Sequence, residues 1–186
     1  MKGICFIKPL FHATIEGRKT ETRRIVKSKR GIIKFKDGLY TLGCKKIQPK
    51  YKVGEIVYLK EPYCLNCESK PCYKYDKQES LCGLWKWKNK LFMPEKYAQY
   101  FIEITGVRYE RLKDISDEDC MKEGIQKQQW SNPEPMEQPF YVIPDMSCEL
   151  AETPQAAYAA LINHINGKGT WESNPYVWVY DYKLLK

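Results

Sequence analysis

The chain has 186 residues, of which 43% are hydrophobic and 13% aromatic, so it can bury a sizeable core without covalent staples, and its composition argues against disorder. The net charge is +8, but residues 1–60 carry a net +12 and residues 61–186 a net −4. A basic half favours an anionic partner, most commonly nucleic acid, and the alternative is a solvated, lysine-rich surface.

Neither a secretory signal nor a membrane-spanning segment is expected. The apolar run at residues 4–10 is short and is interrupted by Lys8 and Pro9. No stretch approaches the roughly 20 apolar residues that span a bilayer. We therefore expect a cytoplasmic protein without a membrane partner, in which the eight cysteines stay reduced or bind a metal.

Short elements are predicted for the first third of the chain. Pro9 suits the first turn of a helix and Gly17 suits its end. Asp37-Gly38 lies between apolar alternations, which is typical of a hairpin turn. The expected elements are a strand at 3–8, a helix at 10–16, a loop at 17–24, a hairpin at 32–42 and a buried strand at 53–59.

The rest of the chain mixes strands and helices without regular βαβ alternation, which favours an α+β fold around a small curved sheet or barrel. Ser116 caps a short helix that ends before Gly124, and Thr153-Pro154 begins the longest helix, which runs to about Asn166. The remaining expectations are an irregular insertion at 62–90, strands at 100–107 and 176–182, and a long loop at 126–148.

The segment Gly17-Arg18-Lys19-Thr20-Glu21-Thr22-Arg23-Arg24 resembles the G-x-K-x-x-T-x-R signature of the ASCH domain, a branch of the PUA-like superfamily. Further segments that are similar to the family lie at 53–58, 102–108 and 115–124, and those at 88–94 and 171–179 resemble phage- and prophage-encoded members. The resemblance implies a PUA-like small β-barrel with flanking helices, in one domain spanning residues 1–186. Insertions then fall at about 62–84, which is Cys-rich, and at about 126–150.

The resemblance also implies a cleft suited to RNA or a modified base, and possible chemistry within it. Some small ASCH proteins are amidohydrolases that deacetylate N4-acetylcytidine with a lysine, a threonine and a glutamate, which map by motif to Lys19, Thr22 and Glu123. A hydroxyl needs a neighbouring base, and the lysine could serve if burial or adjacent cations lowered its pKa. The alternative is that the same lysine and threonine contact phosphate or cap a helix, so that the protein binds without catalysis.

For a binding protein, we expect a polar floor of basic side chains that neutralises phosphate, with Glu123 opposite to accept a base amino hydrogen. This floor would comprise Arg18, Lys19, Thr22, Arg23 and Arg24. The partner would be RNA or a modified nucleoside, or DNA.

Further candidate ligand contacts lie outside this floor. Trp85 and Trp87 alternate with Lys86 and Lys88, so they could stack bases or serve a core. Glu103, in the segment similar to the family's central strand, is also a candidate ligand contact.

Two other hypotheses concern the insertions. Cys64-x2-Cys67-x4-Cys72-x9-Cys82 begins with a chelating C-x-x-C, and four thiolates complete a tetrahedral structural zinc site. The alternative is a set of free thiols in a loop. The 126–150 loop could instead make the chain a phage-derived protein-interaction module.

Overall fold

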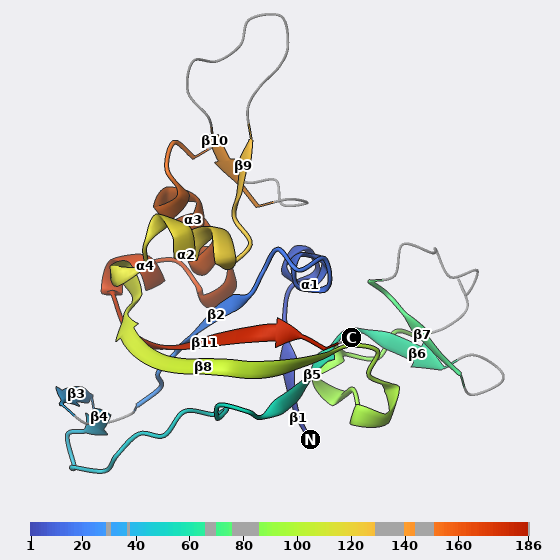
Figure 1. The fold of residues 1–186 in the computed structure, drawn as a ribbon, viewed down its shortest axis with the longest axis horizontal. Helices are drawn as coiled ribbons and strands as arrows, with labels where there is room; N and C mark the ends of the chain where they lie inside the picture. Colours follow the sequence, from blue (N-terminus) through green and yellow to red (C-terminus); the bar gives the residue numbers. More distant parts are fainter. Residues whose placement is uncertain are drawn as a thin grey trace, which may run out of the picture.

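A five-stranded sheet forms the centre of the computed structural model, in the order β1-β5-β8-β11-β2 (Figure 1). The structure describes residues 1–28, 31–36, 38–65, 70–75, 86–128, 140–143 and 151–185. β1 runs parallel to β5, and the other neighbours are antiparallel. The strands are β1 (Lys2–Cys5), β2 (Glu21–Ile25), β5 (Ile56–Lys60), β8 (Phe101–Arg111) and β11 (Tyr176–Leu184).

The sheet is curved along β8 (Figure 1). The β8–β11 register shifts between Asp181 and Tyr182, and such bulges increase the local bend and twist. Gly106 lies opposite Asp181, where a larger residue would overlap the carboxylate. Among the described residues no ladder joins the edge strands β1 and β2, although Arg24 Nη2 donates to the Cys5 carbonyl at 2.9 Å. The α+β class is confirmed, and the closed PUA-like barrel stays a prediction.

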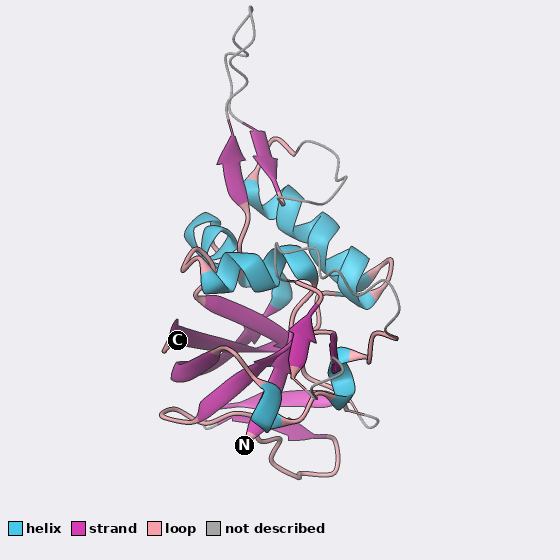
Figure 2. Cartoon of the chain, turned by 90° about the vertical axis from the view of Figure 1, so that its right-hand side faces the viewer, coloured by secondary structure: helices cyan, strands magenta, loops and turns pink. Residues whose placement is uncertain are grey.

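Four helices lie on one side of this sheet (Figure 1; Figure 2). They are α1 (Lys8–Ile15), α2 (Asp117–Lys122), α3 (Pro154–Asn166) and α4 (Thr170–Ser173). Phe11 of α1 and Leu161 of α3 pack on Ile102 and Val179 of the sheet in one buried cluster. None of the described helices has the length and apolarity that crossing a bilayer requires.

Three two-stranded ribbons and three 3-10 turns complete the described structure. The ribbons are β3–β4 (Ile32–Phe35, Gly38–Thr41), β6–β7 (Tyr63–Leu65, Pro71–Tyr73) and β9–β10 (Gln126–Gln128, Phe140–Val142). The turns are η1 (Lys90–Phe92), η2 (Glu95–Tyr97) and η3 (Leu112–Asp114).

The helix caps and the β3–β4 hairpin follow the sequence prediction, but three segments predicted to be irregular contain strands. Ser116 and Thr153 accept the capping hydrogen bonds of α2 and α3. The expected loop at 17–24 contains most of β2, because its polar residues pair with β11 and bury their charges in ion pairs rather than in an apolar face. The segments 62–90 and 126–148 contain short two-stranded ribbons, which their polar composition does not predict.

Candidate functional site

The turn after α1 and the end of α2 bring Lys19 and Glu123 together. Gly17, at φ +76°, closes the helix, and the Lys19 amide donates to the Ala13 carbonyl at 2.8 Å. Glu123 caps α2 and is followed by Gly124 at φ +104°. Lys19 and Glu123 are 1% and 3% exposed, and their side chains form a buried ion pair.

The Lys19 ammonium group is fully occupied. It donates to the Glu123 carboxylate, to the Glu21 carbonyl at 2.7 Å and to the Glu123 carbonyl at 2.9 Å. Burial lowers the pKa of Lys19, while Glu123 opposes that shift. An ammonium group has three hydrogens, so these acceptors use all of them. Lys19 makes no hydrogen bond to Thr22, and in this arrangement it holds the floor of the site together.

Arg23 is the second cation of this floor. Its backbone N–H donates to Glu123 Oε1 at 2.6 Å, and its buried guanidinium pairs with Glu21. The same guanidinium reaches Glu110 at 2.7 Å and Asp119 at 3.0 Å. The charge of Arg23 is therefore already balanced by carboxylates within the protein, and its contact with a phosphate stays a prediction.

The network extends outward from Glu21 to Arg108. Glu21 is fully buried and accepts from Arg108 Nη2 at 2.7 Å, while Arg108 also pairs with Asp181 at 2.9 Å. Burial, followed by the neighbouring Asp181 carboxyl, raises the pKa of Glu21 to about 7, against the opposing effect of Arg108 and Arg23. The floor therefore contains a carboxyl group that titrates near neutral pH.

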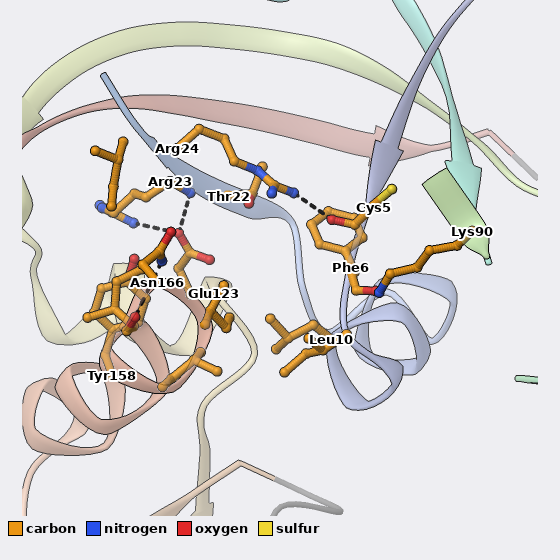
Figure 3. A pocket seen from close by; sticks show the side chains of 15 residues that line it. Cys5, Phe6, Leu10, Thr22, Arg23, Arg24, Lys90, Glu123, Tyr158 and Asn166 are labelled. Carbon is orange, nitrogen blue, oxygen red and sulfur yellow. Dashed lines mark hydrogen bonds and ion pairs between the residues drawn. The ribbon is translucent and has the colours of Figure 1, made fainter. Parts of the chain in front are cut away.

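A cavity of about 190 Å³ lies above this floor, between α1, β2 and α3 (Figure 3). Thr22, Glu123 and Tyr158 provide polar atoms, and Phe6 and Leu161 are among the apolar walls. The Thr22 and Tyr158 hydroxyls have no hydrogen-bond partner among the described residues. Two hydroxyls and a carboxylate thus face an otherwise largely apolar space, which is how small-molecule sites are commonly built.

Arg24 stands at the edge of the cavity. Its guanidinium lies 5.3 Å from the centre of the Phe6 ring, and its buried Nε has no hydrogen-bond partner in the described part of the chain. Lys90 also lines the cavity and donates to the Phe6 carbonyl at 2.6 Å. Because Nη2 already donates to the Cys5 carbonyl and Nε is buried, a ligand at this edge would meet the positive charge of the guanidinium rather than a free Nε–H.

The structure brings together part of the residue set expected from the sequence. Thr22, Arg23, Arg24 and Glu123 line the cavity, and Lys19 lies beneath Glu123. The other candidates lie elsewhere: Arg18 pairs with Glu16, Glu103 pairs with Lys183 at 2.9 Å, and half-buried Trp87 does not line the cavity. Trp85 lies outside the described residues.

The structure describes two of the four cysteines of the predicted zinc site. Cys64 and Cys72 lie opposite each other in the β6–β7 ribbon, and Cys67 and Cys82 lie outside the described residues. Within the described ranges no group of three or more His, Cys, Asp or Glu could hold a metal. Most of the 126–150 loop, residues 129–139 and 144–150, also lies outside the described part.

Sequence reasoning missed Tyr158 and Asn166 as lining residues. Both are on α3, whose periodic apolar residues predict a core helix. Tyr158 occupies one of those core positions, and nothing in the pattern shows that its hydroxyl meets a cavity. The comparisons add no assignment: no protein-family model, no curated protein and no solved structure matches the chain.

Proposed function

We propose that the protein binds a nucleobase of RNA, of another nucleic acid or of a modified nucleoside in the cavity between Phe6 and Tyr158. The observation that carries the proposal is the pair of unpartnered hydroxyls, Thr22 and Tyr158, beside the Glu123 carboxylate. The volume of about 190 Å³ is below the roughly 300 Å³ at which drug-sized pockets begin, so it suits a single planar ring system.

The polar groups favour a base with an exocyclic amino group. Glu123 already accepts hydrogen bonds from Lys19 and Arg23, but a carboxylate has about four acceptor positions. It can therefore accept an amino hydrogen while the Thr22 and Tyr158 hydroxyls bond ring nitrogen or carbonyl atoms. The sugar and phosphate would remain at the edge, where the Arg24 guanidinium provides a positive charge.

The ion-pair network explains how such a site could be specific. Lys19 and Arg23 fix both oxygens of Glu123 before a ligand arrives. A site whose buried polar groups are preorganised discriminates strongly against ligands that leave them unpaired. The ASCH resemblance supports the same ligand class.

An amidohydrolase acting on N4-acylated cytidine is the second candidate, because the unbonded Thr22 hydroxyl lies beside the Glu123–Lys19 pair. Thr22 Oγ1 would attack the acyl carbon, and the amide C–N bond would break as the pair transferred the hydroxyl proton to the leaving amine. Water would then hydrolyse the threonine ester to release the acid. This candidate ranks second because the Lys19 ammonium group donates its three hydrogens to other acceptors and makes no hydrogen bond to Thr22.

Calorimetry and chromatography together separate the two functions. Wild-type protein, Thr22→Val, Tyr158→Phe and the control Thr20→Val, an exposed threonine, would be titrated with cytidine, adenosine, uridine and N4-acetylcytidine. Binding without product, weakened by Thr22→Val and Tyr158→Phe but not by the control, is expected. Release of cytidine from N4-acetylcytidine would favour the hydrolase, and neither binding nor turnover would contradict both.

A further inference from the structure

The cavity adjoins a longer depression. It shares Cys5, Arg24, Ile25 and Asn166 with a hollow of about 750 Å³ between the edge strands β1 and β2. That hollow in turn shares residues with a third, of about 640 Å³, formed by the chain around residues 41–48. The residues common to the second and third hollows are Lys27, Ile47 and Gln48. We call the second and third hollows together the trough.

All of the charged residues that line the trough are basic. Six basic residues border it and no aspartate or glutamate does: Arg24, Lys27, Lys45, Lys46, Lys50 and Lys60. Among the described residues, no carboxylate pairs with Lys27, Lys45, Lys50 or Lys60. The cations below the cavity, by contrast, are all paired. Uncompensated charge along a hollow concentrates anions there.

Aromatic side chains accompany these cations. Trp178 lines the trough and also an adjoining hollow that includes Tyr109. The rings of Trp178 and Tyr109 are 5.8 Å apart in an edge-to-face arrangement, and both residues are half-buried. Lys34 of the β3–β4 ribbon lies over Tyr109, 5.8 Å from its ring centre. Half-exposed rings among lysines are the usual surface for stacking unpaired bases.

We infer that the trough holds the backbone of a single-stranded polynucleotide, one base of which enters the cavity. This inference rests on the proposed function and specifies its ligand as a strand rather than a free nucleoside. One nucleotide needs one phosphate contact, which Arg24 can supply at the edge of the cavity. Lys45 and Lys46 line the third hollow, which shares no residue with the cavity. A mononucleotide bound in the cavity would therefore place no phosphate beside them. An intact duplex would not present a base to the cavity, because its bases are stacked and paired.

The test compares chain length and salt dependence in two matched variants. Lys45→Ala/Lys46→Ala removes two charges from the far end of the trough, and Lys113→Ala/Lys168→Ala removes two exposed charges elsewhere. Each protein would be titrated with cytidine monophosphate and with oligocytidylates of up to about ten nucleotides. Ribose, deoxyribose and duplex versions distinguish the strand type.

The expected result is an affinity that rises with oligonucleotide length. Lys45→Ala/Lys46→Ala should weaken oligonucleotide binding several-fold and reduce the slope of log affinity against log salt by at least about 0.7, the contribution of one phosphate contact on a single strand, because no carboxylate among the described residues pairs with Lys45. Binding of the mononucleotide should not change, and neither should any binding by the Lys113→Ala/Lys168→Ala control.

Other outcomes separate the two claims. Equal affinity for mononucleotide and oligonucleotide, or a salt slope unchanged in Lys45→Ala/Lys46→Ala, would overturn the trough and leave the base site intact. Duplex binding as tight as single-strand binding would also overturn it. Oligonucleotide binding that is indifferent to Tyr158→Phe would instead contradict the proposed base site. A protein that binds none of these probes would contradict both.

Discussion

Lys19 and Glu123 are 104 positions apart in the chain, and their side chains meet in a buried ion pair whose carboxylate also faces the cavity. The backbone N–H of Arg23 holds the second carboxylate oxygen at 2.6 Å. Both contacts form within the protein itself, so the acceptor is oriented before any ligand binds. The same pair joins the turn after α1 to the end of α2, which links the stability of the fold to the geometry of the site.

Breaking this pair should destabilise the protein asymmetrically. We expect Glu123→Gln to lower the free energy of unfolding by about 3–5 kcal/mol, because it leaves a buried ammonium group without a carboxylate. Lys19→Met should cost less, since Arg23 still binds Glu123. Urea denaturation of both variants and of the double variant Lys19→Met/Glu123→Gln gives the coupling energy, and strict additivity would contradict the pair. The exposed Lys183–Glu103 pair is the control: Glu103→Gln should change stability by less than about 1 kcal/mol.

The meeting of Lys19 and Glu123 could be predicted from the sequence only through the family resemblance. The residues show a basic segment and a capped helix ending at Gly124, but no local pattern places one beside the other. The basic segment was also expected to bind ligand as a set. In the structure it divides, because Lys19 and Arg23 are buried and pair with carboxylates, whereas Arg24 pairs with no carboxylate among the described residues.

Glu21 should make the free energy of unfolding fall as the pH rises. Its pKa rises from 4.5 to about 7 in the folded protein, so the folded state keeps a proton that the unfolded chain loses between these values. The contribution of Glu21 to stability is therefore complete below pH 4.5 and is lost as the pH rises through about 7. Its slope is at most about 1.4 kcal/mol per pH unit. Glu21→Gln should remove this decline, measured by urea denaturation across that range.

Asp119 offers a control of the opposite sign. Burial alone would raise the pKa of Asp119, but hydrogen bonds from Lys122 and Arg23 hold this pKa below 3.8. The contribution of Asp119 is present above pH 3.8 and is lost as the pH falls through its lowered pKa. Asp119→Asn should therefore alter the acid limb of the stability profile and leave the decline toward pH 7 in place. If the free energy of unfolding changed by the same amount between pH 4.5 and pH 7 in the wild type and in Glu21→Gln, the assignment of this decline to Glu21 would be contradicted.

The pairing of Cys64 with Cys72 bears on the predicted zinc site. Cys64 and Cys72 are directly opposite in an antiparallel ribbon, where Cβ atoms are about 4.5–5.5 Å apart, a separation that allows two thiolates to share one ion. We expect about one zinc per chain by elemental analysis, lost in Cys72→Ser and kept in Cys44→Ser, whose thiol is exposed in another part of the chain. Purified protein that is free of zinc and whose unfolding is indifferent to chelators would contradict the site.

The elements predicted well are those with local chemical signals. Ser116, Thr153-Pro154 and Gly167 mark helix ends through hydrogen bonds or backbone angles that neighbouring residues determine. β2 was missed because its stability comes from pairing with β11 and from ion pairs to α2, and both are distant in sequence. A cleft was expected from the family resemblance, but the wall that β2 contributes to the cavity was missed for the same reason.

Gly124 should be the glycine to which the site is most sensitive. Its φ of +104° strains any L-residue, and an added Cβ would lie 3.2 Å from Leu10 Cδ2. Gly167 has the same φ but no atom within 4 Å of the added carbon, so Gly167→Ala measures the backbone strain alone, at about 1–3 kcal/mol. Gly124→Ala should cost more, and only this variant should also weaken nucleoside binding, because it displaces the adjacent Glu123. Equal losses of stability in the two variants, with binding unchanged in both, would show that Leu10 moves aside and that Glu123 does not depend on this turn.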